Sequence, residues 1–264
     1  MAIENLEQMF KRADPIDLDE GLVAYDRYHL VMQRIADRFA CSLATATAVF
    51  VALSPNSSYH QNLRSAVSVL DGALKRHAGP DDITVATYGH CKKRAWLYAT
   101  GRSDFLSEAK GPKIVSFYHN ILDPKDSRWV TVDGHMSCIW QGKNLSMRDA
   151  LVSRATYETI RAATLSLAFT HYMIPCQMQA VLWFTRKRIS NVVYDPQMQL
   201  FADRSDVWNT FVDVNAIKPY GRKDEIPATL SGRGRDVAPS AGPATTAHDE
   251  LQDGQLYLPY RPGE

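Results

Sequence analysis

The chain has 264 residues, a formal net charge of +1 and 22% charged residues. This length is enough for one large domain or two small helical ones with a buried core. The near-neutral charge excludes a strong overall field that would draw the protein to nucleic acid. Nucleic-acid binding would therefore have to come from a local basic patch and oriented backbone groups.

The sequence contains no motif typical of a metal or cofactor site. Its four cysteines form no CxxC pair, and its eight histidines are scattered along the chain. A zinc or iron–sulfur site would need clustered ligands, so we expect reduced thiols and no metal. No phosphate-binding loop, dinucleotide fingerprint, zinc-protease or nucleophile-elbow motif occurs, and no cofactor is expected.

No targeting or membrane segment is visible. The first twenty residues are polar and acidic, unlike a basic stretch followed by an apolar one. The longest apolar runs, such as Val49–Leu53, are far too short to cross a bilayer. We therefore expect a cytoplasmic protein with no membrane partner.

Apolar residues in the first hundred positions recur at helical spacing. The stripe is clearest over residues 22–39, where Asp17 or Asp19 is placed to cap the helix. A helix over residues 43–53 should end at the Ser54-Pro55 step, because proline lacks an N–H donor and restricts its predecessor. Two more helices are predicted, one ending near residue 75 and one over residues 88–99.

Residues 103–122 predict a helix, a hairpin and a second helix. Residues 103–108 should form the short first helix and residues 109–112 the tight turn. The second helix should cover residues 113–122. Pro112 suits its first turn, because the missing N–H would be unpaired there anyway.

Asp133 follows the apolar, β-branched run Trp129–Val132, which favours an extended backbone. Residues 134–141 then predict a short helix, so Asp133 is placed as its N-cap. Further along, Ser146 and Asp149 resemble a capping box that would open a helix to about residue 172.

A last helix should span residues 175–188, where Trp183 lies on a helical stripe typical of the core. The composition changes after residue 203 and becomes rich in Gly, Pro, Ser and charge from residue 222. We therefore predict a helical catalytic domain over residues 1–203 and a partly disordered extension over residues 204–264.

Two segments form a recognisable pair: Gly111-Pro112-Lys113 followed by IVSFYHNIL, and WVTVDGH at residues 129–135. Together they resemble the helix-hairpin-helix DNA glycosylase superfamily, of the endonuclease III and adenine-glycosylase type. Its members have a Gly-rich hairpin before a lysine, then a short apolar stretch ending in Val-Asp-x-His. The resemblance implies an all-α fold with the active site in a cleft between two helical subdomains. The hairpin here has one glycine rather than two.

The resemblance also assigns roles to individual residues. Asp133 matches the catalytic aspartate, and Lys113 matches the lysine of the bifunctional members. Asn56, in the polar turn after Leu53-Ser54-Pro55, matches the residue that fills the gap left by a flipped base. DNA contacts are expected from the following further residues: Gly111, Lys110, His135, Lys92, Lys93 and Arg94.

These residue types suit cleavage of an N-glycosidic bond. Positive charge develops at the sugar C1′ as the base leaves, and a nearby carboxylate stabilises it. A deprotonated lysine could attack C1′ and form a Schiff base, after which β-elimination would nick the strand. The base must first leave the DNA helix to be reached.

Three alternatives stay open from the sequence. The first is a phage-type enzyme on the same scaffold that modifies thymine bases instead of excising them. The second is a DNA-binding module without catalysis. The third is a helical scaffold protein with no nucleic-acid partner, which the near-neutral charge favours.

Overall fold

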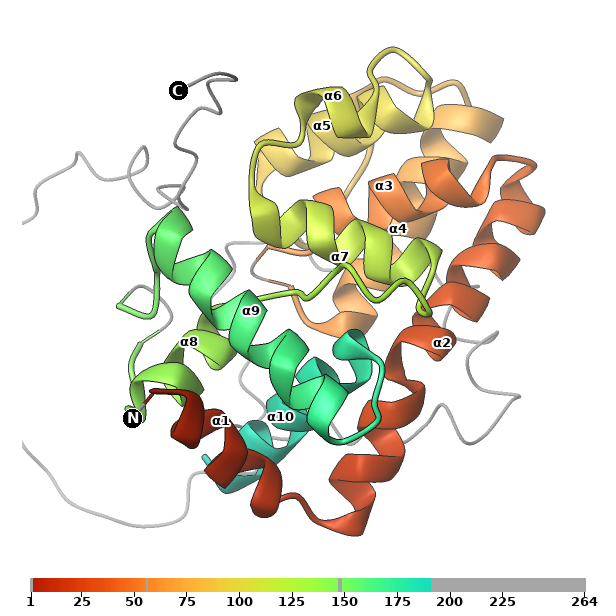
Figure 1. The fold of residues 1–264 in the computed structure, drawn as a ribbon. Coiled ribbons are helices and arrows are strands. Elements are labelled where there is room, and N and C mark those ends of the chain that lie inside the picture. Colours follow the sequence, from red (N-terminus) through yellow and green to blue (C-terminus); the bar gives the residue numbers. More distant parts are fainter. Residues whose placement is uncertain (1, 56, 147–148, 191–264) are drawn as a thin grey trace, which may run out of the picture.

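The computed structural model describes residues 2–55, 57–146 and 149–190 (Figure 1). Those residues form helices and connecting loops without a strand, which confirms the prediction of a mostly helical chain. The α-helices are α1 (Ala2–Lys11), α2 (Pro15–Phe39), α3 (Leu43–Ala52), α4 (Tyr59–Leu70), α5 (Gly89–Ala99), α6 (Phe105–Glu108), α7 (Pro112–Leu122), α8 (Gly134–Gln141), α9 (Arg154–Thr170) and α10 (Pro175–Ile189). A π-helical turn, η1 (Asp71–Lys75), continues α4, and a 3-10 turn, η2 (Pro80–Asp82), precedes α5.

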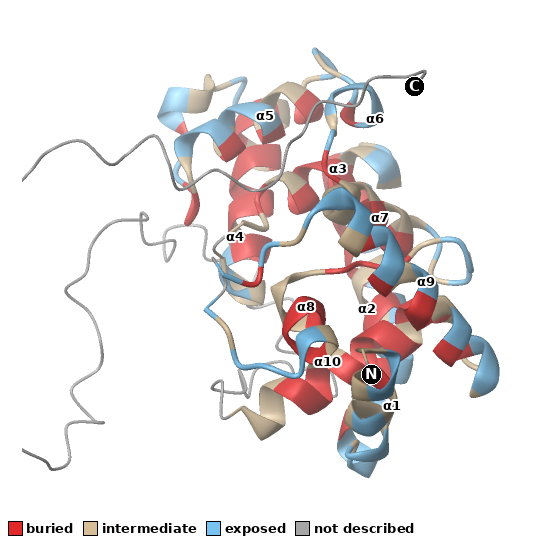
Figure 2. Cartoon of the chain, turned by 60° about the vertical axis from the view of Figure 1, so that its left-hand side comes forward, coloured by how far each residue is buried: buried red, intermediate tan, exposed pale blue. Residues whose placement is uncertain are grey.

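Two hydrophobic cores organise these helices. The larger core is built from α2 to α7, and the smaller from α1, α8, α9 and the segment 130–132. In Figure 1, α3 to α7 occupy the upper half, α1, α8 and α9 the lower half, and α2 runs along one side. Figure 2 shows α3 and the inner face of α4 buried between their neighbours.

Helix α10 belongs to both cores. Cys176, Ala180 and Phe184 pack into the larger core. Met178 and Leu182 pack into the smaller one. Each set repeats every four residues, so two faces of one helix serve two cores.

Helix α2 begins earlier than the apolar pattern predicts, so the predicted N-cap at Asp17 or Asp19 was wrong. Asp14 is the N-cap residue and Pro15 occupies the first helical position. Asp17 is fully buried and accepts hydrogen bonds from the Asp14 N–H at 3.0 Å and from Arg188 Nε at 2.8 Å. The first turns are thus held by polar contacts, which an apolar stripe does not reveal.

Only one of the two bonds of the predicted capping box at Ser146 and Asp149 is present, and it does not open a helix. The Asp149 N–H donates to Ser146 Oγ at 3.2 Å within a turn. Helix α9 begins only at Arg154, where Ser153 Oγ accepts the Thr156 N–H at 3.2 Å. Ser153 rather than Ser146 is the N-cap residue of this helix, so the predicted start was wrong.

Helices α2 and α10 approach each other closely at Gly21. A Cβ atom built there would lie 2.6 Å from the Val181 backbone nitrogen and 2.7 Å from its Cα. Only a residue without a side chain permits this packing, which joins α2 to the helix shared by both cores.

Within the described residues, no single helix has the length and apolar character of a membrane span. One pair, α2 with α3, passes that test when its two helices are joined, and they meet at 112°.

Candidate active site

The predicted helix, hairpin and helix lie at α6, the residues 109–111 and α7. Asp104 caps α6 by accepting the Ser107 N–H at 2.8 Å. Gly111 is the buried N-cap residue of α7, Pro112 is its first residue and Lys113, which is partly buried, its second. Among the described residues, no side chain caps α7, so its first N–H groups and Lys113 lie together at a positive helix end.

Asp133 is the N-cap of α8, as predicted, and both of its carboxylate oxygens are held. Its Oδ1 accepts the Met136 N–H at 3.0 Å. Its Oδ2 accepts the Trp183 Nε1–H at 3.1 Å. The carboxylate is therefore fixed between the start of α8 and the middle of α10, where Trp183 lies.

His135 lies beside this carboxylate, with its ring 5.8 Å from the Trp183 ring in an edge-on arrangement. Burial is the main cause that lowers the pKa of His135, and the positive charges of Arg186, Lys187 and Lys113 lower it further. The negative charge of Asp133 acts in the opposite direction. Lys113 and Asp133 thus act electrostatically on the same imidazole.

We call Lys113, Asp133, His135, Trp183 and Lys187 the α8 cluster. Lys187 Nζ lies 4.1 Å from the centre of the Trp183 ring, a cation–π contact. The cluster joins both cores, since α7 packs into the larger, α8 into the smaller and α10 into both.

Trp183 packs against the larger core, as its helical stripe predicts, and it has a second role that the sequence did not reveal. It is only partly buried, and its indole N–H serves the Asp133 carboxylate.

An aromatic group that the sequence analysis missed lies one helical turn beyond Lys113. Phe117 contacts Tyr25, Tyr28 and Phe50, with ring centres 6.3, 5.8 and 6.1 Å away. Tyr59 adds to the group, with its ring centre 5.3 Å from that of Tyr28. The spacing of four residues between Lys113 and Phe117 was the available signal, since it puts both side chains on one helical face.

Other predicted DNA-contact residues are not brought together at the α8 cluster. Lys110 Nζ donates to the Ser107 carbonyl at 3.1 Å, and Lys92 Nζ donates to the Ile83 carbonyl at 3.0 Å. Lys93 and Arg94 are exposed on α5. Asn56 lies outside the described residues.

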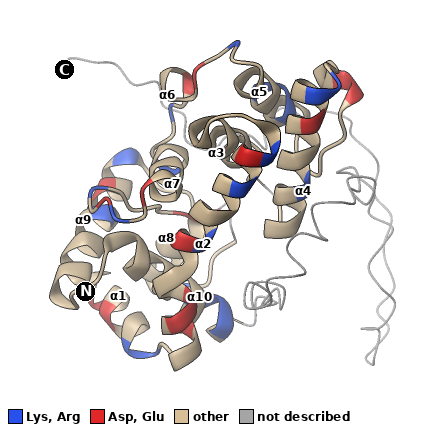
Figure 3. Ribbon diagram, turned by 90° about the vertical axis from the view of Figure 1, so that its right-hand side faces the viewer, with Lys and Arg blue, Asp and Glu red and all other residues tan. Residues whose placement is uncertain are grey.

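The described residues show neither a region of one charge sign nor a group of metal ligands. In Figure 3, basic and acidic residues are interspersed on several helices, in keeping with the small net charge. Within residues 2–55, 57–146 and 149–190, no group of three or more His, Cys, Asp or Glu is placed to hold a metal ion.

Fold and site together define a helical protein built on two cores, with a carboxylate, an imidazole and two lysines at their junction. The chain belongs to a protein family of unknown function, DUF7178, whose model matches residues 1–190. No curated protein and no solved structure matches the chain.

Proposed function

We propose that this chain is a DNA N-glycosylase that acts on a flipped base, with Asp133 and Lys113 as its catalytic residues. The observation that supports this most directly is the way in which the Asp133 carboxylate is held. Both of its oxygens are fixed by N–H donors, and Lys113 acts on the same imidazole. A fixed carboxylate can stabilise the positive charge that develops as an N-glycosidic bond breaks, and a lysine whose charge reaches the same imidazole is a candidate nucleophile.

In the proposed reaction, Asp133 stabilises the positive charge that develops at C1′ of the sugar. The neutral amine of Lys113 attacks C1′ as the bond to the base breaks, and the base leaves with the bonding electrons and takes up a proton. Loss of a proton from nitrogen and opening of the sugar ring give a Schiff base. Removal of a 2′ proton then expels the 3′ phosphate and nicks the strand.

The aromatic group supports binding of an extruded base. Tyr28, Tyr59 and Phe117 are partly buried, and Phe117 is one turn from Lys113. Base–aromatic stacking contributes about 1–3 kcal/mol per base, which offsets part of the cost of unstacking. Burial raises the pKa of Tyr28, so its ring stays neutral at working pH.

The DNA backbone would meet the start of α7. Its uncapped N–H groups and the ammonium group of Lys110 are suited to one phosphate. The single hairpin glycine is buried, so the backbone of Gly111 itself would not be the contact.

The test is borohydride trapping on duplex and single-stranded oligonucleotides that carry an abasic site or a damaged base. We expect a covalent adduct with the wild type, none with Lys113→Ala, and a release rate reduced at least about 100-fold with Asp133→Asn. Lys125→Ala, which changes an exposed lysine outside the cluster, is the matched control and should trap normally.

Mass spectrometry of the same oligonucleotides separates the alternatives. An altered base that stays attached to its sugar would favour the thymine-modifying reaction over excision. A third outcome is that wild type and Asp133→Asn bind DNA equally and form neither product. This result would favour a DNA-binding module without catalysis and would contradict our proposal.

A further inference from the structure

The segment that leads into Asp133 is buried but has no neighbouring strand. Val130 and Val132 are 0% and 3% exposed, and both pack into the smaller core. Since the described residues form no strand, the backbone N–H and C=O groups of this segment cannot pair as they would in a sheet. Buried backbone groups need hydrogen-bond partners, so other elements must supply them.

Helix α9 supplies these partners along one edge of the segment. The Tyr157 hydroxyl lies 3.0 Å from the Val130 carbonyl oxygen and 3.4 Å from the Val132 nitrogen. Arg161, one turn later on α9, donates from Nη2 to the Arg128 carbonyl at 3.2 Å. Residues 128, 130 and 132 are alternate positions, which in an extended chain present their backbone groups along the same edge. Helix α9 therefore takes the place of a neighbouring strand.

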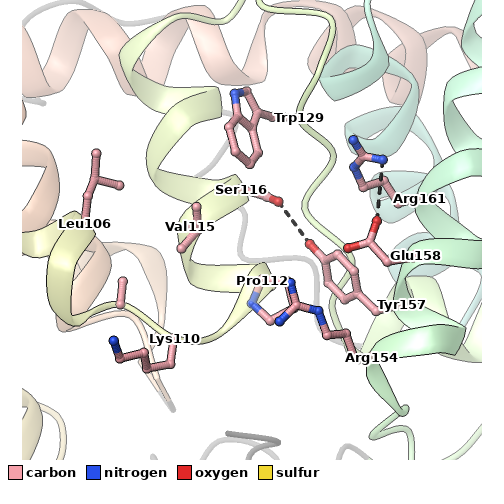
Figure 4. Close-up of a pocket in the computed structure, with 11 residues that line it drawn as sticks. Leu106, Lys110, Pro112, Val115, Ser116, Trp129, Arg154, Tyr157, Glu158 and Arg161 are labelled. Carbon is pink, nitrogen blue, oxygen red and sulfur yellow. Dashed lines mark hydrogen bonds and ion pairs between the residues drawn. The ribbon is translucent and has the colours of Figure 1, made fainter. Parts of the chain in front are cut away.

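The Tyr157 hydroxyl has one proton and three partners. A carbonyl can only accept, so Tyr157 donates to Val130. It then accepts from the Val132 N–H and from the hydroxyl of Ser116 on α7, which lies 3.1 Å away (Figure 4). Burial is the main cause that raises the pKa of Tyr157 to about 12, whereas the bonds from Ser116 and Val132 lower it. The proton donated to Val130 therefore stays on the phenol oxygen at neutral pH.

Helix α7 holds the same segment through a side chain. Asn120 Nδ2 donates to Thr131 Oγ1 at 3.0 Å, and both residues are buried. Successive side chains of an extended chain point to opposite faces, so Thr131 faces away from the smaller core that receives its two neighbours. The segment 130–132 is thus held by both α7 and α9 immediately before Asp133.

This arrangement matters for where the Asp133 carboxylate lies. Its bonds with Met136 and Trp183 restrict its rotation, but the backbone that carries it also follows from the segment before it. We propose that Tyr157 is a positioning residue for Asp133, because its hydroxyl holds the backbone of residues 130–132 and so sets the place of the carboxylate beside His135. A catalytic consequence rests on the proposed function, whereas the placement of the carboxylate does not.

The first test is the NMR titration of His135 in the full-length chain. Burial lowers the pKa of this imidazole and the charge of Asp133 raises it, so the midpoint reports whether the carboxylate stays close. Tyr157→Phe keeps the ring and removes the hydroxyl. The released segment should let the carboxylate move away, which lowers the midpoint toward that of Asp133→Asn.

A double variant shows whether this effect passes through the carboxylate. In the Asp133→Asn background, Tyr157→Phe should cause no further shift of the His135 midpoint, because the charge is already absent. An unchanged midpoint in Tyr157→Phe, or an equal shift in both backgrounds, would overturn the proposal. A merely structural role of Tyr157 would lower the stability in urea without moving the midpoint.

Two further variants complete the test. Tyr118→Phe is the matched control, since Tyr118 is also a buried tyrosine but stacks on Phe105 in the larger core, and it should titrate like the wild type. Ser116→Ala removes one of the three contacts of the Tyr157 hydroxyl, so it should lower the midpoint by less than Tyr157→Phe does. If circular dichroism shows that Tyr157→Phe does not fold, Ser116→Ala decides, and an unchanged midpoint there would overturn the proposal.

Kinetics then test the catalytic consequence. Tyr157→Phe should slow base release about tenfold at an unchanged KM, because a displaced carboxylate affects the reaction rather than the binding of DNA. Tyr118→Phe should release the base at the wild-type rate. Wild-type kinetics in Tyr157→Phe would overturn the positioning role in catalysis. A wild type without any base release would contradict the proposed function instead, and the His135 titration would still decide whether Tyr157 places Asp133.

Discussion

Asp133 serves a helix and a neighbouring ring at once. One oxygen closes the first turn of α8, and the other holds the indole of Trp183 on α10. Each contact restricts the rotation of the carboxylate, and preorganised charge of this kind acts without rearrangement during a reaction. The residues around Asp133 therefore set the orientation of its carboxylate, on which any catalytic role depends.

The pKa of His135 should report directly on Lys113. Its pKa is below the ordinary value of 6.5, and removing one nearby positive charge should raise it. We expect Lys113→Met to shift the NMR titration midpoint of His135 upward. His119, whose lowered pKa depends on burial and on Asp126 and Arg128, is the internal control and should not move.

The same shift has a consequence for stability. The unfolded chain takes up a proton near pH 6.5, whereas folded His135 does so only at lower pH. Stability should therefore fall as pH decreases from about 6.5 through the folded pKa. His135→Gln should reduce that loss in urea titrations, and an unchanged pH profile would contradict the assignment.

Trp183 should act as a positioning residue for Asp133. Trp183→Phe keeps an aromatic ring but loses the N–H donor. A hydrogen bond to a charged group contributes about 1.5–3 kcal/mol, so base release should slow at least about tenfold. Trp140→Phe, a like substitution in the smaller core, should leave the rate unchanged. Equal rates of base release for Trp183→Phe and Trp140→Phe would contradict a positioning role for Trp183.

At the scale of elements, the close approach of α2 to α10 at Gly21 leaves no room for a side chain. Gly21→Ala would force a Cβ atom against the Val181 backbone. We expect a loss of about 1–3 kcal/mol in the free energy of unfolding, because overpacking outweighs the helix propensity of alanine. Gly89→Ala, in α5 with open space around it, is the control and should be neutral or slightly stabilising by urea denaturation.

Capping and chemistry at the start of α8 can be separated. Asn caps helices as well as Asp does, whereas Ala costs about 1 kcal/mol. Asp133→Asn should therefore lose activity with a smaller loss of stability than Asp133→Ala shows in thermal melting. Equal loss of stability in both variants would mean that the charge itself holds the fold.

For the whole molecule, local signals in the sequence were sufficient to predict many of the helices but not the contacts between them. Asp133 was found as an N-cap because an extended run and a helix flank it, and Pro112 marked the start of α7. The contact of Asp133 with Trp183 joins residues 50 positions apart, and no local pattern encodes it. The helix over residues 2–11 was missed, although Ile3, Leu6 and Phe10 have helical spacing.

Both cores should unfold together. Because α10 packs into both, neither core keeps its full complement of contacts when the other is lost. Urea transitions followed by tryptophan fluorescence and by circular dichroism should coincide. Two separated transitions would show that the cores fold independently.

The double use of α10 also constrains how this chain can change over generations. A substitution on one of its faces alters a core, but a shift or rotation of the helix that would accommodate the change disturbs the other core at the same moment. Substitutions that change specificity should therefore accumulate in the hairpin and the segment beside it, where they do not require both cores to repack.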